Sequence, residues 1–438
     1  MEIIEGFLEA KKRLSRQVST EFYPTPLTPG LESRDLPARY EAEKEVRKIV
    51  DDVYLRKDAA LLELSSRFDG VNLTSLEVTK KQIASAYQKV DKELVAALEL
   101  AAGRIRSFHR AQKDNIWHEL DKPGLRQLIR PLKRIGIYIP GGTAAYPSTV
   151  LMTAIPARVA GVDEVIMVTP PGKSGTVPPS VLVAAHIAEV DCVFCVGGAQ
   201  AIAALAFGTE SIPKVDKICG PGNIFVTLAK RFVYGEVDID GLQGPSDVLI
   251  IADENAKPEY CAADLLAQAE HDPLASANLI TTSRKLANRV NLELEQQIGD
   301  LPRKAIASQS LKRGIIVVDV TIDEAIELAN LNAPEHLCLM VDKADSYVNK
   351  IRNAGCIIAG RDATVVISDY VAGPSHALPT GGTARFSSPL SVNDFIKFIN
   401  VVSVDDSSLR ELGEAASIIA RAEGLEAHAR AVERFKAD

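Results

Sequence analysis

The chain has 438 residues, of which 46% are hydrophobic, and it carries a formal net charge of −8. A chain of this length is enough for roughly two to four domains with apolar cores. The negative balance and the lack of a basic stripe argue against nucleic acid and anionic membranes as partners.

The sequence is that expected of a soluble, cytoplasmic protein. It contains no run of about eighteen apolar residues, and its first residues lack the basic and apolar regions of a signal peptide. Its six cysteines are scattered through apolar segments, which is typical of reduced thiols. The CxxC pair Cys192 and Cys195 lies in an expected strand, where residues three apart face opposite sides. Buried structural cysteines are therefore favoured over a zinc or redox site.

The chain is expected to begin with a helical region and to continue as an α/β fold. Residues 1 to 112 are charged and follow a helical period. From Leu132 onward, short β-branched runs alternate with small-residue helical runs. The expected strands are Arg134–Ile139, Glu164–Thr169, Asp191–Val196, Lys214–Cys219 and Val248–Ala252, and the helices between them are Ser148–Ala160, Pro178–Ala188, Ala199–Phe207 and Asn223–Phe232. This alternation predicts a doubly wound, mostly parallel sheet.

A second α/β stretch follows the first. Its expected elements are helix Pro258–Glu270, strands Ala277–Thr282 and Gly314–Val318, helix Asp323–Asn330, and strands Leu337–Val341, Cys356–Ala359 and Thr364–Ser368. The second of these helices opens with a capping box, Thr321-Ile322-Asp323-Glu324. From Ser391 the tail is expected to be helical, most clearly over residues 415–435.

Three glycine-rich loops lie where expected strands give way to helices. They are Tyr138-Ile139-Pro140-Gly141-Gly142, Gly197-Gly198-Ala199-Gln200 and Gly220-Pro221-Gly222-Asn223. Ligands of doubly wound sheets bind at such places, where backbone N–H groups can meet an anion. None of the loops matches GxGxxG, so a dinucleotide site and plain tight turns both stay open. Tyr138, Gln200 and Asn223 are the side chains best placed to meet a ring or a ribose.

Four of the seven histidines lie beside carboxylates or amides in the second half of the chain. On one expected helix Asp264, Gln268 and His271 share a face, so Gln268 and His271 could hold one metal ion. The remaining ligand candidates are Asp369 and His428, and such a nitrogen and oxygen set suits catalytic zinc. The alternative is that His271 only caps the C-terminus of its helix.

An adjacent acid and base, Glu335 and His336, follow Pro334. The proline is expected to hold them in a turn, where one residue could act on a substrate and the other on a water. Two solvated loop residues fit the pattern equally well. His376 and Ser246 also lie in expected turns, each after a Gly-Pro pair.

Together these segments resemble the histidinol dehydrogenase family. The likeness covers residues 30 to 435 in the same order and runs through the three glycine-rich loops and residues 244–246, 268–271, 334–336, 369–379 and 423–428. The resemblance implies one zinc ion per subunit, bound by Gln268, His271, Asp369 and His428. It assigns NAD to Tyr138, Gln200 and Asn223, and catalysis to Glu335 and His336. The implied substrate contacts are Ser246, Gln268, His271, Glu335, His336, Asp369, His376, Glu423 and His428.

The resemblance also implies a fold with two incomplete Rossmann-like domains, a helical N-terminal region and a helical C-terminal tail. The implied limits are 1–112 for the helical region, 113–137 with 246–390 for the first Rossmann-like domain, 138–245 for the second, with the NAD loops, and 391–438 for the tail. The first Rossmann-like domain carries most of the metal and catalytic residues. In a homodimer with exchanged tails, Glu423 and His428 would complete the active site of the partner subunit.

The implied reaction is the four-electron oxidation of L-histidinol through L-histidinal to L-histidine, the last step of histidine biosynthesis. His336 would remove the hydroxyl proton, Glu335 would activate water, and two NAD would accept the hydrides. The chain departs from the family at Ser368, where glycine is more frequent, and at Ser375, where asparagine is frequent. A related zinc and NAD dehydrogenase for another amino or sulfonated alcohol is therefore the alternative.

Two further classes of protein fit less well. A zinc hydrolase that uses Glu335 to activate water would leave the glycine-rich loops without a role. A binding protein without activity conflicts with the intact Glu335-His336 pair.

Overall fold

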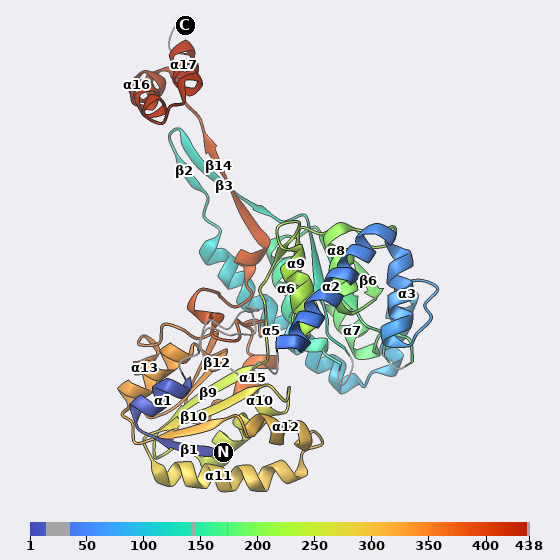
Figure 1. Cartoon of the computed structure of the whole chain (residues 1–438), viewed down its shortest axis with the longest axis vertical. Coiled ribbons are helices and arrows are strands. Elements are labelled where there is room, and N and C mark those ends of the chain that lie inside the picture. The colour runs from blue at the N-terminus through green and yellow to red at the C-terminus, as the bar shows by residue number, and fades with distance from the viewer. Residues whose placement is uncertain (15–35, 142–144, 173, 436–438) are drawn as a thin grey trace. The chain divides into compact units, whose positions relative to one another are not determined.

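The computed structural model describes residues 1–14, 36–141, 145–172 and 174–435. The chain forms two compact units, one made of Met1–Gln112 and Leu132–Phe395, the other of Lys113–Pro131 and Ile396–Asp438. The first unit holds two parallel sheets flanked by helices, and the second holds a small antiparallel sheet followed by two helices (Figure 1).

One sheet of the first unit has five parallel strands in the order β6-β5-β4-β7-β8. Its strands are β4 (Arg134–Tyr138), β5 (Glu164–Thr169), β6 (Cys192–Cys195), β7 (Lys217–Cys219) and β8 (Asp238–Ile239). The helices between them are α6 (Pro147–Ala160), α7 (Pro179–Ile187), α8 (Gly198–Phe207) and α9 (Ile224–Val233). Counted from β4, this is the order 3-2-1-4-5 of a Rossmann sheet without its sixth strand.

The other sheet of this unit has six parallel strands in the order β1-β11-β10-β9-β12-β13. Its strands are β1 (Glu2–Glu5), β9 (Asp247–Ala252), β10 (Ser276–Thr281), β11 (Ile315–Val318), β12 (His336–Met340) and β13 (Cys356–Ala359). Counted from β9, the 3-2-1-4-5 order recurs, with β1 added beside β11. Two incomplete Rossmann-like sheets are thus confirmed. The domain limits themselves stay predictions, and β4 begins before the expected limit at residue 138.

The helices around the six-stranded sheet are α10 (Pro258–Ala269), α11 (Arg284–Gln297), α12 (Lys304–Leu311), α13 (Ile322–Asn332), α14 (Asp345–Val348) and α15 (Val365–Tyr370). Successive residues of β9 face opposite sides of the sheet. Val248 and Ile250 belong to the core that α10 and α11 cover, whereas Leu249 and Ile251 belong to the core on the other face, with α13. Burial on both faces explains why these strands read as unbroken apolar runs.

The N-terminal region contains the helices α1 (Phe7–Leu14), α2 (Leu36–Arg56), α3 (Asp58–Asp69), α4 (Lys80–Ala86) and α5 (Lys92–Ile116). Helix α2 packs Val46, Ile49 and Val53 against the core of the five-stranded sheet, on the side of α8 and α9 (Figure 1). The expected helical N-terminal region is confirmed by these helices. It is wrong at Glu2–Glu5, because each of these residues pairs with β11 as a parallel edge strand.

Another expected strand, Thr364–Ser368, is wrong, because these residues begin the short helix α15. The Thr364 side chain accepts the N–H of Val366, and the carboxylate of Asp264 on α10 accepts the N–H of Val365. These two caps satisfy N–H groups that a first helical turn leaves without partners, which outweighs the strand preference of two valines. The capping box at Thr321 is confirmed at the start of α13.

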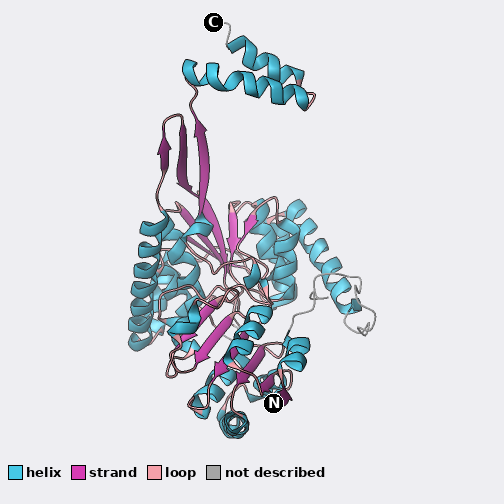
Figure 2. Cartoon of the chain, turned by 90° about the vertical axis from the view of Figure 1, so that its left-hand side faces the viewer, coloured by secondary structure: helices cyan, strands magenta, loops and turns pink. Residues whose placement is uncertain are grey.

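The second unit contains the antiparallel sheet β14-β3-β2, with β2 (Leu120–Lys122), β3 (Leu125–Pro131) and β14 (Ile396–Val402). Two helices follow, α16 (Asp406–Ala422) and α17 (Glu426–Phe435) (Figure 2). The expectation of a helical tail from Ser391 is wrong over β14, whose seven residues all pair with β3. Within the ranges that the structure describes, no helix has both the length and the apolar character needed to cross a bilayer.

Candidate active site

The acid–base pair lies at the amino end of β12, beside the amino end of the neighbouring strand β9. His336 is the first residue of β12 and pairs with Val248 of β9, and Asp247 is the first residue of β9. The expected turn is present at Glu335 but wrong for His336, which is already part of the strand. Glu335 and His336 are only 5% and 3% exposed, so the reading as solvated loop residues is excluded.

The side-chain carboxylates of Glu335 and Asp247 each accept the backbone N–H of the other residue. The N–H of Asp247 donates to Oε2 of Glu335 at 2.8 Å, and the N–H of Glu335 donates to Oδ1 of Asp247 at 2.9 Å. The N–H of Gly381 also donates to Asp247, at 3.3 Å. Burial raises the pKa of the Glu335 carboxyl group to about 7. A carboxyl group with this pKa can exchange a proton with water near neutral pH.

His336 has one bonded ring nitrogen and one without a partner. Its Nε2 lies 2.9 Å from Oδ1 of Asp369. Burial disfavours the charged ring, but the hydrogen bond to Asp369 and the charge of Glu335 outweigh it and raise the pKa of His336 to about 9. The other nitrogen, Nδ1, is buried and has no hydrogen-bond partner among the described residues. Since buried polar atoms are nearly always bonded, this nitrogen is the natural position for a substrate group.

Three of the four expected metal ligands lie on or directly after the helices α10 and α15. Gln268 is 2% exposed in the last turn of α10, and His271 follows that helix. Desolvation lowers the pKa of His271, while the nearby charge of Asp369 on α15 acts to raise it. Asp264, one turn before Gln268, connects the two helices, since it accepts Oγ1–H of Thr364 at 2.5 Å and N–H of Val365 at 3.2 Å.

These three side chains fit a zinc ion by their chemistry. An amide, an imidazole and a carboxylate form a nitrogen and oxygen donor set without cysteine, as in open catalytic sites. Over the residues that the structure describes, no three His, Cys, Asp or Glu side chains gather as a metal site. The fourth expected ligand, His428, lies on α17 of the second unit, and Glu423 ends α16 there; both are exposed. Their roles stay predictions.

His376 uses both ring nitrogens within the fold. Nδ1 donates to the backbone carbonyl of Asp369 at 2.7 Å, so Nε2 accepts the hydroxyl of Thr149 on α6 at 3.3 Å. Burial lowers the pKa of His376, which keeps the ring neutral. In this position His376 holds Asp369 in place, and its substrate contact stays a prediction. Ser246, half-buried just before β9, likewise stays a predicted substrate contact.

The three glycine-rich loops meet at the carboxyl end of the five-stranded sheet. The N–H of Gly198 donates to the hydroxyl oxygen of Tyr138 at 3.2 Å. A Cβ atom on Gly220 would lie 2.1 Å from the carbonyl oxygen of Tyr138, and one on Gly141 or Gly197 would strike Pro170. Glycine is therefore required for these loops to pack together. Gly142 lies outside the described residues.

The side chains expected to contact NAD are buried in these loops or hydrogen-bonded within them. Tyr138 and Gln200 are 4% and 2% exposed, and burial raises the pKa of Tyr138 to about 12. Asn223 caps α9, because its Oδ1 accepts the N–H groups of Phe225 and Val226. Their contact with NAD stays a prediction. An asparagine before an apolar helical run is a capping signal that the sequence already contained.

The two sheets contribute opposite ends of their strands to the candidate active site. Two of the glycine-rich loops follow β4 and β7, the strands between which the strand order reverses, where Rossmann sheets bind dinucleotides, and the third follows the edge strand β6. Glu335 and Asp247 lie instead at the amino end of the six-stranded sheet. The bond between His376 and Thr149 joins the two halves, since Thr149 is near the start of α6, just beyond β4.

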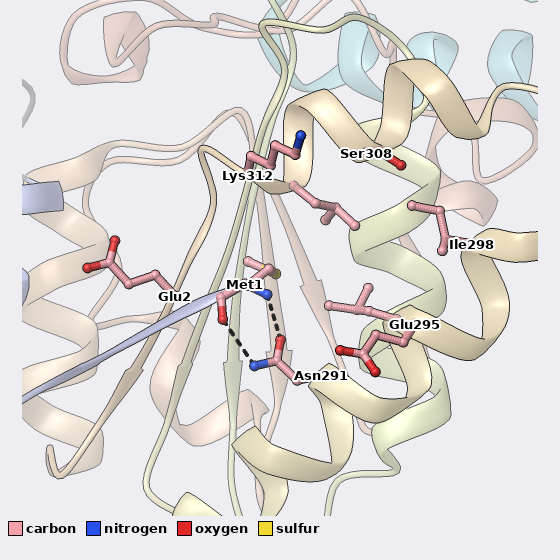
Figure 3. A pocket seen from close by; sticks show the side chains of 9 residues that line it. Met1, Glu2, Asn291, Glu295, Ile298, Ser308 and Lys312 are labelled. Carbon is pink, nitrogen blue, oxygen red and sulfur yellow. Dashed lines mark hydrogen bonds between the residues drawn. The ribbon is translucent and has the colours of Figure 1, made fainter.

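A separate pocket lies beside α11 and α12. It has a volume of about 370 Å³ and is lined by residues that include Met1, Leu294 and Lys312 (Figure 3). The amino group of Met1 donates to Oδ1 of Asn291 at 2.9 Å. The lining includes none of the predicted site residues, so this pocket is not the candidate active site.

Comparisons with known proteins agree with this geometry. The sequence pattern of the histidinol dehydrogenase family matches residues 33–435. The histidinol dehydrogenase of Dehalococcoides mccartyi (strain CBDB1) is 56% identical over 435 residues, 99% of each chain, and that of Clostridium acetobutylicum is 49% identical over 411 residues, 93% of this chain and 95% of its own. The crystal structure of histidinol dehydrogenase from Elizabethkingia anophelis superposes with a TM-score of 0.90 at 38% identity, covering 100% of this chain and 98% of that one. The chain therefore belongs to the histidinol dehydrogenase family of oxidoreductases.

Proposed function

We propose that this protein catalyses the zinc-dependent oxidation of L-histidinol through L-histidinal to L-histidine, with two NAD as hydride acceptors, as the last step of histidine biosynthesis. The observation that carries the proposal is the buried, unpartnered Nδ1 of His336 beside the buried carboxyl group of Glu335. The two oxidations each need a group that takes up a proton, and His336 and Glu335 are two such groups with different pKa values in a buried place.

The zinc ion would be held by Gln268, His271 and Asp369, with His428 supplied by the partner subunit. When bound, zinc would supply a Lewis acid that orients the amino alcohol and offsets the charge of Asp369. Asp264 and His376 hold Asp369 in position for this role, one through the N-terminus of α15 and the other through the Asp369 carbonyl group.

In the first oxidation His336 acts as the base. In the neutral ring, which becomes more populated as pH rises toward the pKa of about 9, Nδ1 would accept the hydroxyl proton of histidinol while the hydride on the carbon that bears this hydroxyl passes to NAD, which leaves the aldehyde and NADH. Asp369 fixes the ring through Nε2 and stabilises the imidazolium that forms. Because His336 is 3% exposed, the proton is transferred in a place that excludes bulk water.

In the second oxidation Glu335 acts as the base. Its carboxylate would take a proton from water as the water oxygen adds to the aldehyde carbon, giving the anion of the hydrate. Hydride transfer from this carbon to a second NAD then gives the carboxylic acid, which loses its proton. The backbone bond from Asp247 leaves Glu335 in a fixed orientation throughout.

The two departures from the family do not favour another substrate. The hydroxyl of Ser368 donates to the carbonyl of Val365 inside α15, at 2.7 Å. The hydroxyl of Ser375 donates to the carbonyl of Met152 at 3.0 Å, and the residue is 3% exposed. Both serines are therefore bonded within the fold, and histidinol stays the proposed substrate.

The proposed substrate is tested by NAD reduction with the purified, zinc-loaded protein. L-histidinol is compared with aliphatic amino alcohols and with sulfonated diols at equal concentration. We expect kcat/KM to be highest for L-histidinol, with histidine as the product. A clear preference for a sulfonated diol would refute the substrate assignment and leave the chemistry in place.

The second unit favours a homodimer. It exposes large apolar side chains along β14 and along the helices α16 and α17; examples are Phe398, Val402, Leu412, Ile418, Ile419 and Phe435. Their exposed fractions range from 52% for Phe398 to 76% for Phe435. Apolar patches of this kind are typical of surfaces that another chain covers. We infer that a second copy covers them and that each tail completes the site of its partner.

A further inference from the structure

A buried ion pair lies beside the glycine-rich loop that follows β7. Lys230 on α9 and Asp240, just beyond β8, form a salt bridge, and each side chain is only 2% exposed. Lys230 also donates to Oε1 of Gln243 at 3.1 Å. No motif in the sequence singled out these residues, and they belong neither to the expected metal site nor to the acid–base pair.

The two charged groups bond the backbone N–H and the carbonyl group of the same glycine. The N–H of Gly220 donates to Oδ2 of Asp240 at 2.7 Å, and Lys230 donates to the carbonyl oxygen of Gly220 at 3.1 Å. Gly220 has a φ of +114°, and its Cα lies so close to Tyr138 that any side chain would clash with the backbone there. The ion pair therefore fixes both peptide groups around a backbone position that only glycine can occupy.

This glycine is at the point where a nucleotide is expected. Gly220 follows β7 and touches the end of β4, the two strands between which the strand order reverses. The same ion pair also fixes the segment 240–246, which crosses to the six-stranded sheet. Asp240 belongs to this segment, Lys230 bonds Gln243 within it, and Ser246 is its last residue. Thr227 on α9 adds a bond from its hydroxyl to the carbonyl of Gln243, at 3.1 Å.

Stability alone does not account for a charged pair at this place. Removing two charges from water has a large cost, and a well-packed apolar pair of similar size is often as stable or more so. What an apolar pair cannot do is bond the N–H and the C=O of Gly220. The function of the pair is therefore better sought in the position of the loop.

We propose that Lys230 and Asp240 are positioning residues for NAD, which fix the Gly220 loop in the form that receives the nucleotide and align it with the segment that carries Ser246. This inference rests on the proposed use of NAD. It adds two residues to the cofactor site that do not themselves touch the cofactor.

The test is calorimetric titration of full-length, zinc-loaded protein with NAD. In the double variant Lys230→Met with Asp240→Leu, both charges are removed together, so neither is left buried without its partner. We expect the double variant to stay folded with a lower melting temperature, because the N–H and C=O of Gly220 lose these partners. Kd for NAD should rise by at least about tenfold, which equals about 1.4 kcal/mol. The KM for NAD should rise in parallel, and the KM for L-histidinol should stay the same.

Lys217→Met is the matched control. Lys217 is also a buried lysine of this sheet, 6% exposed, and within the described residues it pairs with Asp238 at 3.0 Å and with Asp394 at 3.5 Å rather than with the Gly220 loop. Its loss should leave Kd for NAD unchanged even if the melting temperature falls. An equal rise in Kd for this variant would show a general loss of stability and would overturn the positioning role.

A folded double variant with the Kd of the unaltered protein would also overturn the inference. If the double variant does not fold, Lys230→Met with Asp240→Asn keeps the shape of the second side chain and an acceptor for the N–H of Gly220. This variant tests the loss of the bond to the carbonyl group of Gly220, and Kd for NAD should again rise. Failure of the proposed function is distinguished by the unaltered protein, because absence of NAD binding there would refute the use of NAD and the inference with it.

Discussion

The replacement Glu335→Gln should change how the stability of the protein depends on pH. The pKa of Glu335 is raised from 4.5 to about 7 by burial, and each pKa unit corresponds to about 1.4 kcal/mol, so the ionised carboxylate costs about 3 kcal/mol of folding free energy. Below pH 4.5 the group is protonated in the folded and unfolded states and costs nothing. Stability is therefore lost as pH rises from 4.5 through about 7. Glutamine is neutral throughout and lacks this loss.

The assay is urea denaturation of the two proteins at several pH values between about 5 and 8, at one protein concentration. We compare the unfolding free energy of the Glu335→Gln variant with that of the unaltered protein. The variant minus the unaltered protein should increase by about 3 kcal/mol across this range, less the stability that the unaltered protein has already lost at about pH 5. A difference that stays constant with pH would show that Glu335 has an ordinary pKa. The reasoning from burial would then be wrong.

The same variant separates the two oxidations. With L-histidinal as the starting substrate, the rate for the unaltered protein should rise as Glu335 ionises around pH 7. Glu335→Gln should lower that rate by about 10² to 10⁴-fold, as expected for loss of a general base, while Kd for NAD stays the same. A variant that oxidises the aldehyde at the unaltered rate would exclude Glu335 as the base.

Three further predictions concern the metal site and the dimer. His271→Asn should weaken zinc binding by more than about a hundredfold, whereas His336→Asn should keep zinc but slow proton removal; normal zinc content in the first variant would refute the ligand assignment. Asp264→Asn should weaken zinc binding by about ten- to a hundredfold, because Asp264 holds the helix that carries one ligand; competition with a chelator measures this. His428→Asn and Glu335→Gln chains are refolded together. If tails are exchanged in a symmetric dimer, about half of the dimers are mixed and each of these has one intact site, so about one quarter of all sites should be active. No recovery would contradict the exchange.

The sequence predicted the parallel sheets well because their strands are buried on both faces. Such strands read as apolar runs whatever their neighbours are, and strand Cys356–Ala359 is predicted with its observed limits. Edge strands carry a weaker signal. β1 has acidic residues at both ends, like the helical region that follows it. β14, with the sequence IKFINVV, does carry the β-branched and aromatic residues of a strand, and this signal was missed in the expectation of a helical tail. Their pairing partners lie far away in the chain.

The candidate site was predicted in its residue types but only in part in its arrangement. Histidines beside carboxylates pointed to Glu335, His336 and Asp369; the structure buries the first two side by side and brings His336 within hydrogen-bond range of Asp369. The expected strand Leu337–Val341 already placed both residues at the amino end of a strand, although the general rule places ligands at carboxyl ends. Asp247, which orients Glu335 through its backbone, gave no signal because any residue type except proline supplies an N–H group there.

The helix α15 illustrates the limit of local patterns. Its two valines favour a strand, and the cap that makes it helical includes Asp264, about a hundred residues earlier in the chain. The helical period alone places Asp264 on one face with Gln268 and His271. Its bond to the next ligand-bearing helix depends on tertiary structure.

The most direct test of the account is the stoichiometry of NAD reduction by the purified protein with limiting L-histidinol. With zinc present, we predict two NADH for each L-histidinol consumed and one L-histidine formed. After removal of zinc by a chelator the reaction should stop, and added zinc should restore it. One NADH with release of the aldehyde, or full activity without zinc, would contradict the account of Glu335, His336 and their zinc-binding neighbours.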